Sequence, residues 1–289
     1  MNKTTLIILL SLAILFGSIK AILDHVVLQT METSIGRLAP VAWVTYQHAG
    51  LSLPINLSVS GLNIAPHAWP PVQIEKATIY GIPEFALQAP LPSSAHVLLS
   101  NIHAELPWPR IAPEWVSLFD YTDWFLSDRE LAALGFQALR GDLEVQMTRD
   151  EETDRTAIQV NLDDSNFGVV ELNAVLTNLP PPPWTQGTWL RVRLAELALI
   201  YTDPSFIEKS TAFLARRNGL PHSELQKAMA QRLQSDLQVV LPRAAASELG
   251  VFIETPRQLT ITIKPTQPIA IANLRRLPVR QWALAIKGS

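Results

Sequence analysis

The chain of 289 residues contains no cysteine, and this absence removes several kinds of chemistry. Without thiols there is no disulfide, no thiolate zinc site and no thiol nucleophile. Charged residues are also scarce, at 17% of the chain, and the formal net charge is only -3. Because no run of basic residues stands out, nucleic acid is not expected as a partner.

Glycine is scarce as well: there are 12 glycines against 22 prolines, while apolar residues make up 48% of the chain. This balance indicates many extended segments punctuated by proline rather than long helices. Apolar and polar residues alternate along 139–148 and again along 156–163, on either side of a charged turn. A period of two on both sides of a turn predicts an antiparallel β-hairpin, the clearest in a series of short strands.

One glycine marks a change of phase within a predicted strand. Ile55, Leu57 and Val59 alternate with polar residues, but after Gly61 the apolar positions move to Leu62 and Ile64. A slip of one residue at a glycine predicts a β-bulge, which would bend the sheet.

The longest apolar run lies at the start of the chain. Between Thr5 and Leu23 only Lys20 is charged, and a helix of this length spans about 28 Å, close to the core of a bilayer. We predict a transmembrane anchor, with a single pass through an inner membrane and the bulk of the chain in the periplasm. A cleaved signal peptide and a buried core helix are the alternatives; no A-x-A-like pair of small residues follows the run.

Helix signals are concentrated in the second half of the chain. Ser127 and Glu130 form a capping-box pattern for a short helix. Asp203 and Pro204 start a longer helix that ends near Gly219, and a second helix runs from Ser223 to Pro242. A short link between two amphipathic helices predicts an antiparallel helical hairpin, which we expect to cover one face of the sheet.

The predicted fold class is therefore α+β: an N-terminal transmembrane helix, then a mainly antiparallel, curved β-sheet domain with a helical hairpin packed on it. The expected regions are an anchor (1–25), a helical stalk (26–40), an N-terminal β region (41–126), a β-meander (127–202), the helical hairpin (203–250) and C-terminal strands that complete the sheet (251–289).

No constellation of catalytic residues stands out. The sequence has no phosphate-binding loop, dinucleotide-binding glycine pattern, HExxH or GxSxG motif. His96 and His103 are seven residues apart on one predicted strand, which would place them on opposite faces. We expect no enzyme, no metal and no cofactor. A hydrolase would need a polar cleft, for example near His103, Asp120 and Asp123.

Aromatic residues gather in the segment 107–126, where one reading is a short helix and loop packed on the sheet and the other is a surface that contacts a ligand or membrane. The candidate residues for a hydrophobic-ligand or interface surface, there and on the predicted helices, are Trp108, Trp115, Trp124, Phe206, Phe213 and Met229.

The order of segments resembles that of the AsmA-like proteins and of uncharacterised membrane-anchored periplasmic proteins of Gram-negative bacteria. The resemblance rests on VTYQHAGLSLPINLSVSGLNI (44–64) after the apolar run, and on the patterns at 134–147, 163–179 and 200–220. It implies a sheet whose apolar face contacts lipid, and it supplies no catalytic residue.

Together these features predict a non-enzymatic, membrane-anchored envelope protein that binds lipid or another hydrophobic ligand in a β-sheet groove, with the helices at 206–237 as a lid. The alternative is a scaffold or assembly factor of an envelope protein complex, and a hydrolase with an unrecognised site is a third hypothesis. The expected partners are the membrane, through the N-terminal helix, a lipid and envelope proteins.

Overall fold

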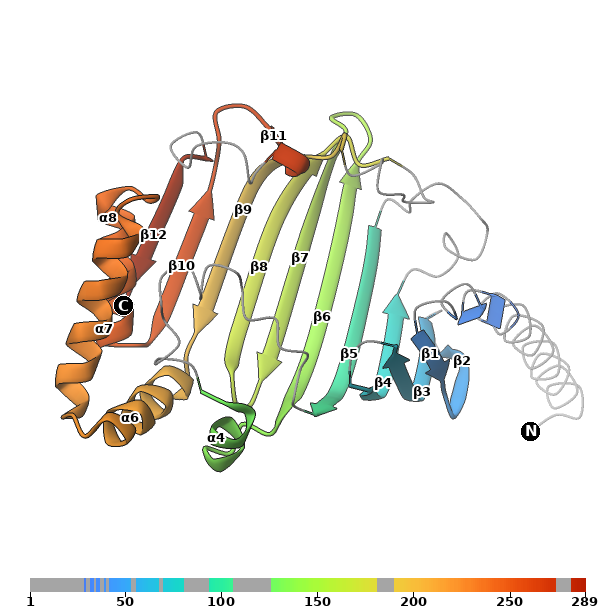
Figure 1. Ribbon diagram of the computed structural model, residues 1–289. Coiled ribbons are helices and arrows are strands. Elements are labelled where there is room, and N and C mark those ends of the chain that lie inside the picture. Colours follow the sequence, from blue (N-terminus) through green and yellow to red (C-terminus); the bar gives the residue numbers. More distant parts are fainter. Residues whose placement is uncertain are drawn as a thin grey trace, which may run out of the picture.

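A computed structural model of the protein describes residues 42–52, 56–67, 70–80, 94–105, 126–180, 190–273 and 282–289, with isolated positions between 29 and 39. Twelve strands form one antiparallel sheet in the order β1-β3-β4-β5-β6-β7-β8-β9-β10-β12, with β2 paired to β3 and β11 paired to β9 (Figure 1). The β5–β6 pairing joins the strands before residue 127 to those after it.

The strands are β1 (Ala42–Thr45), β2 (His48–Ser52), β3 (Asn56–Pro66), β4 (Val72–Tyr80), β5 (Ser94–Glu105), β6 (Ala138–Asp150), β7 (Arg155–Asp164), β8 (Gly168–Thr177), β9 (Arg193–Thr202), β10 (Gln258–Ile263), β11 (Ile269–Ala270) and β12 (Leu284–Gly288). The helices are α4 (Asp128–Ala133), α6 (Phe206–Asn218), α7 (His222–Leu237) and α8 (Arg243–Glu254), with a short 3-10 turn η2 (Ile271–Asn273).

The register of the ladders collects apolar side chains on one face of the sheet. In the predicted hairpin, now β6 and β7, Val145 lies opposite Val160, and polar Glu144 lies opposite Asn161. Directly paired residues of antiparallel strands share a face. The hairpin prediction is confirmed, and the same alternation continues into β8, where Leu172 pairs with Val160 and Glu171 with Asn161.

Irregularities in neighbouring strands keep this apolar face continuous. Gly61 has a φ of +63° and has no partner in the β3–β4 ladder, but the register is the same on both sides of it, so the bulge predicted at this glycine is not present in that ladder. Asn101, with a φ of +53°, occupies the register shift between β5 and β6. Its backbone N–H donates to Asp142 Oδ1 at 2.7 Å, and its side-chain amide donates to Glu75 Oε2 at 2.6 Å. The irregularities are therefore tied together across the strands by side-chain hydrogen bonds.

The helices lie mainly at one end of the sheet, and among them only α8 has an extensive contact with a described strand. In Figure 1, α7 and α8 lie beyond β12, while β1 and β2 form the opposite end. α8 packs on β12 and α7 packs on α8, and neither α6 nor α7 has an extensive contact with a described strand. The predicted hairpin of two helices lying on the sheet is therefore wrong. The third helix, α8, makes the contact because the extended backbone at Gly288 lets it approach closely: a Cβ there would lie 2.3 Å from Glu248 O.

The predicted fold class and localisation also need correction on the membrane helix. Among the residues that the structure describes, no helix is long and apolar enough to cross a membrane. The predicted anchor (1–25) lies outside those residues, as does most of the predicted stalk (26–40). The structure supports a mostly antiparallel sheet with few helices. It does not support the predicted single-pass inner-membrane localisation.

We predict that alanine substitutions at Gly288 and Gly250, two glycines at the contacts of α8, change the stability of the protein differently. Gly288→Ala should destabilise the protein by about 1–3 kcal/mol, because the new methyl group would press on the α8 backbone. Gly250→Ala, within α8, should be neutral or stabilising by up to about 1 kcal/mol, since its Cβ would meet Ala230 O at an ordinary 3.5 Å. Urea unfolding of both variants measures this difference. Equal stabilities would contradict the close approach of α8 to β12.

The capping box at α4 generates a second prediction. Ser127 N–H and hydroxyl both donate to Glu130 Oε2 at 2.7 Å, and Arg217 Nη1 on α6 donates to Glu130 Oε1 at 2.9 Å. These contacts, those with Ser127 first, lower the pKa of Glu130 from 4.5 to about 2. The ionised form therefore stabilises the fold fully above about pH 4.5, and this contribution disappears as the pH falls toward 2.

We expect Glu130→Gln to destabilise the protein by roughly 0.5 kcal/mol at pH 7. The difference from the unmodified chain should shrink between pH 4.5 and 2, where that chain also loses the charge. Urea unfolding at several pH values tests this, and a difference that stays constant down to pH 2 would rule out the ionised contact.

Candidate functional site

The candidate site is a row of apolar side chains that crosses the middle of the sheet. One residue on each of seven neighbouring strands contributes to it, and each pairs directly with the next. At about 4.8 Å between strands the row extends roughly 29 Å. All seven side chains are half-buried, and none belongs to the fully buried core. We call this set the central row; its members are Val97, Val145, Val160, Leu172, Leu199, Ile261 and Ile286.

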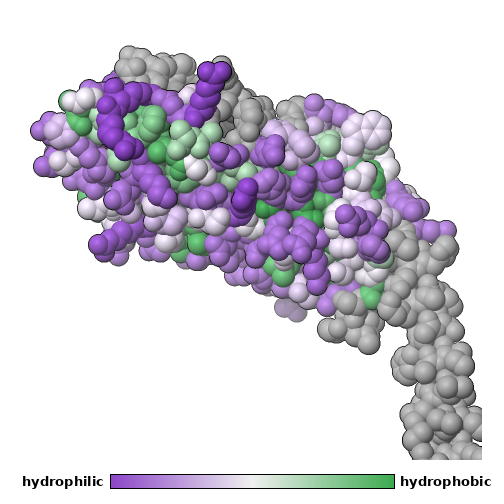
Figure 2. All heavy atoms as spheres, turned by 90° about the horizontal axis from the view of Figure 1, so that it is seen from below, coloured by the Kyte–Doolittle hydropathy of each residue, from purple (hydrophilic) through white to green (hydrophobic). Residues whose placement is uncertain are grey.

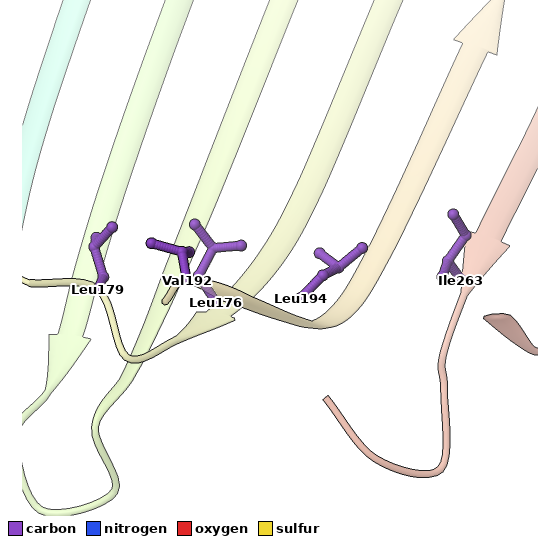
Figure 3. Packing of buried hydrophobic residues seen from close by; sticks show 5 residues of the cluster. All are labelled: Leu176, Leu179, Val192, Leu194 and Ile263. Carbon is purple, nitrogen blue, oxygen red and sulfur yellow. The ribbon is translucent and has the colours of Figure 1, made fainter. Parts of the chain in front are cut away.

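One end of the apolar face is closed by a compact cluster near the ends of β8, β9 and β10. Figure 3 shows its five buried side chains side by side, and the fractional exposure of Val192 is only 1%. Met147 and Ile158, next to the central row, pack against this cluster. Its five buried members are Leu176, Leu179, Val192, Leu194 and Ile263. The central row therefore runs into a packed wall at this end.

The other end of the apolar face is closed by α8. Tyr201 and Gly288 both pair with Leu259, so they lie on the apolar face. Phe252 of α8 contacts the Tyr201 ring edge-on at 6.0 Å. The Tyr201 hydroxyl lies 2.7 Å from both Phe167 O and Asp203 Oδ1. Burial, followed by the contact with Asp203, raises the pKa of Tyr201 well above its usual value, so the hydroxyl stays neutral.

The opposite face of the sheet is mainly polar and holds a shallow depression of about 350 Å³. His96 Nε2 lies 2.7 Å from Glu144 Oε1, and Gln146 Nε2 donates to the same oxygen at 2.8 Å. The hydrogen bond from Gln146, and then His96, lowers the pKa of Glu144. A carboxyl held ionised at neutral pH is a poor general acid. The depression is lined by six polar residues and by Val160, whose side chain belongs to the central row on the other face: Glu144, Gln146, Gln159, Val160, Asn161, Glu171 and Asn173.

The two strand histidines lie on the same face, contrary to the sequence-based prediction. His96 pairs with Gln146 and His103 pairs with Arg140, both on the polar face. The bulge between Leu99 and Ile102 inserts an extra residue, which reverses the alternation between the two histidines. The described residues contain no group of three His, Asp or Glu side chains that could hold a metal ion.

Of the six residues predicted for a hydrophobic surface, the structure describes three, all of them on helices. Trp108, Trp115 and Trp124 lie outside the described residues, as do Asp120 and Asp123. Phe206, at the start of α6, contacts Phe136 edge-on at 4.9 Å and Phe167 at 5.2 Å. It therefore belongs to a packed aromatic cluster between α6 and the sheet.

The other two predicted helix residues, Phe213 and Met229, are also packed within the protein rather than fully exposed to a ligand. Phe213 is half-buried on α6. Met229 of α7 packs against the buried Leu214 and Leu225, which hold the two helices together. The residues of the central row were not among the site residues predicted from the sequence, although the sequence shows that apolar and polar residues alternate along their strands. What the alternation could not show was that seven strands align in one register.

Seen from below, in Figure 2, the described surface is mainly hydrophilic, and hydrophobic residues show as separate patches.

The comparisons with known proteins place the chain in a family without assigning an activity. No curated protein matches the sequence. A family model described as "Uncharacterized protein" matches residues 137–281. The matched segment begins at β6 and ends just before β12. It contains six strands and the helices α6, α7 and α8. Since this match covers half of the 289 residues, the chain belongs to that family.

Proposed function

We propose that the protein binds a hydrophobic ligand, such as the acyl part of a lipid, on the apolar face of its sheet. The observation that carries this proposal is the half-buried central row between two closed ends. Burial of apolar surface lowers the free energy by about 25 cal/mol for each Å² removed from water. A row of Val, Leu and Ile offers no hydrogen-bonding group, so its complement is an apolar surface.

The shape of the row favours an elongated ligand. Its seven members lie on seven neighbouring strands and extend roughly 29 Å, whereas the packed cluster and α8 limit the row along the strand direction. The lid proposed for helices 206–237 finds no support, because α6 and α7 have no extensive contact with a described strand. The resemblance of the sequence to AsmA-like proteins is consistent with a lipid-contacting sheet and stays part of the proposal.

A second candidate function, a scaffold for another protein, is favoured by the free edge of the sheet at β1. Trp43 on this strand is 67% exposed, and among the described strands β1 pairs only with β3. An unpaired strand edge can accept a strand from a partner. This function would not need the central row, so the two candidates differ in the experiment below.

We expect the full chain to bind N-phenyl-1-naphthylamine, a neutral hydrophobic fluorophore, with an increase in its emission. Val97→Thr combined with Val145→Thr places two hydroxyls in the central row at nearly constant volume. Each buried hydroxyl costs about 1 kcal/mol or more, so the affinity should fall about tenfold or more.

The matched control is Val169→Thr combined with Val175→Thr, two half-buried valines on the opposite face of β8. This control should bind the fluorophore like the unmodified chain. Equal affinities for all three proteins, or no binding by the unmodified chain, would refute the proposed site.

A further inference from the structure

A pocket of about 590 Å³ opens at the end of the sheet where the β6–β7 turn, the end of β8, the start of β9 and β11 meet. Its volume is typical of small-molecule sites. Three of its lining residues are arginines and one is an acid, in a chain whose net charge is -3. The described lining consists of Arg149, Asp154, Asn178, Leu179, Pro180, Leu190, Arg191, Arg193 and Ala270.

The positive charge of this pocket is only partly compensated. Arg149 Nη2 lies 3.4 Å from Asp154 Oδ1, and Asp154 Oδ2 also accepts the Asn178 N–H at 3.1 Å. Arg149 Nε is buried and has no hydrogen-bond partner, although the side chain is 18% exposed. Arg191 and Arg193 are exposed, and neither guanidinium pairs with a described side chain. The lining therefore contains three arginines and one aspartate, with Arg149 on the apolar face and Arg193, which pairs with Thr177, on the polar face at the end of the sheet.

The pocket adjoins the apolar face. Leu179 lines the pocket and also belongs to the buried cluster at the end of the central row. Arg149 follows Val145 of the central row by four residues along β6, a distance of roughly 13 Å, and it lies on the same face because it pairs with Thr156. A ligand with a polar end and an apolar body could contact both regions.

We propose that this pocket binds a phosphate or carboxylate group, and that the group belongs to an anionic amphiphile whose apolar part lies on the central row. The anion site stands on the arginines alone, while the amphiphile rests on the function proposed above. Guanidinium groups recognise phosphate and carboxylate through paired N–H donors, and the buried, unpartnered Arg149 Nε supplies one such donor. The same chemistry would recognise a lipid headgroup or a free phosphate, so the test separates them.

The test measures binding of three probes to the full chain by isothermal titration calorimetry. Dihexanoyl phosphatidic acid, below its micelle concentration, carries both parts of the proposed ligand. Dihexanoylglycerol lacks the charge, and inorganic phosphate lacks the acyl chains. We expect phosphatidic acid to bind at least about tenfold more tightly than either fragment, since hydrogen bonds to charged groups are among the stronger ones.

Three variants locate the anion. Arg191→Gln combined with Arg193→Gln should weaken phosphatidic acid at least about tenfold without changing the affinity for dihexanoylglycerol. Arg243→Gln, an exposed arginine on α8 outside the pocket, is the matched control and should have no effect. Asp154→Asn should strengthen anion binding severalfold, because it releases Arg149 while its side-chain oxygen can still accept the Asn178 N–H. A gain of affinity cannot result from misfolding.

The outcomes separate the two proposals. If dihexanoylglycerol binds as tightly as phosphatidic acid and the arginine variant changes nothing, the anion site is refuted while the apolar site stands. If inorganic phosphate binds as tightly as phosphatidic acid, is weakened in the arginine variant, and dihexanoylglycerol does not bind, the anion site stands and the amphiphile is refuted. If none of the three probes binds, both proposals fail.

Discussion

The alignment of apolar side chains across one antiparallel ladder is the constraint on which this structure depends. Directly paired residues share a face, and a slip of one residue would move a whole strand's apolar set to the other side. From Val97 to Ile286 the pairing keeps one apolar residue of each strand in the same row. At Gly61 and Asn101 the backbone takes positive φ angles, and these irregularities restore the phase that the sequence interrupts.

The helices pack at the β12 end of the sheet. Because Gly288 has no side chain, α8 can approach β12 closely there. α7 then packs on α8, and α6 is anchored by Phe206 in its aromatic cluster. The middle of the face stays half-buried as a consequence, and the arginine-lined pocket lies at its other end.

Predictions from short stretches of sequence agreed with the structure where the determining contacts are local. The β6–β7 hairpin and the capping box of Ser127 with Glu130 each depend on residues close together in the chain. The helical hairpin was misplaced because α7 packs on α8, while Leu214, Leu225 and Met229 hold α6 and α7 together. The faces of His96 and His103 were wrong because no glycine marks the bulge between them, where Asn101 takes the positive φ.

The sequence by itself determined the alternation that makes each strand two-faced, the glycines and caps that bend or end elements, and the absence of thiol chemistry, since these follow from the residues and their immediate neighbours. Only the tertiary structure decided that seven strands share one register, which forms the central row, and that Arg149, Arg191 and Arg193 line one pocket. The reason is that hydrogen bonds between strands far apart in the chain set both arrangements, and no local pattern encodes which strands will pair.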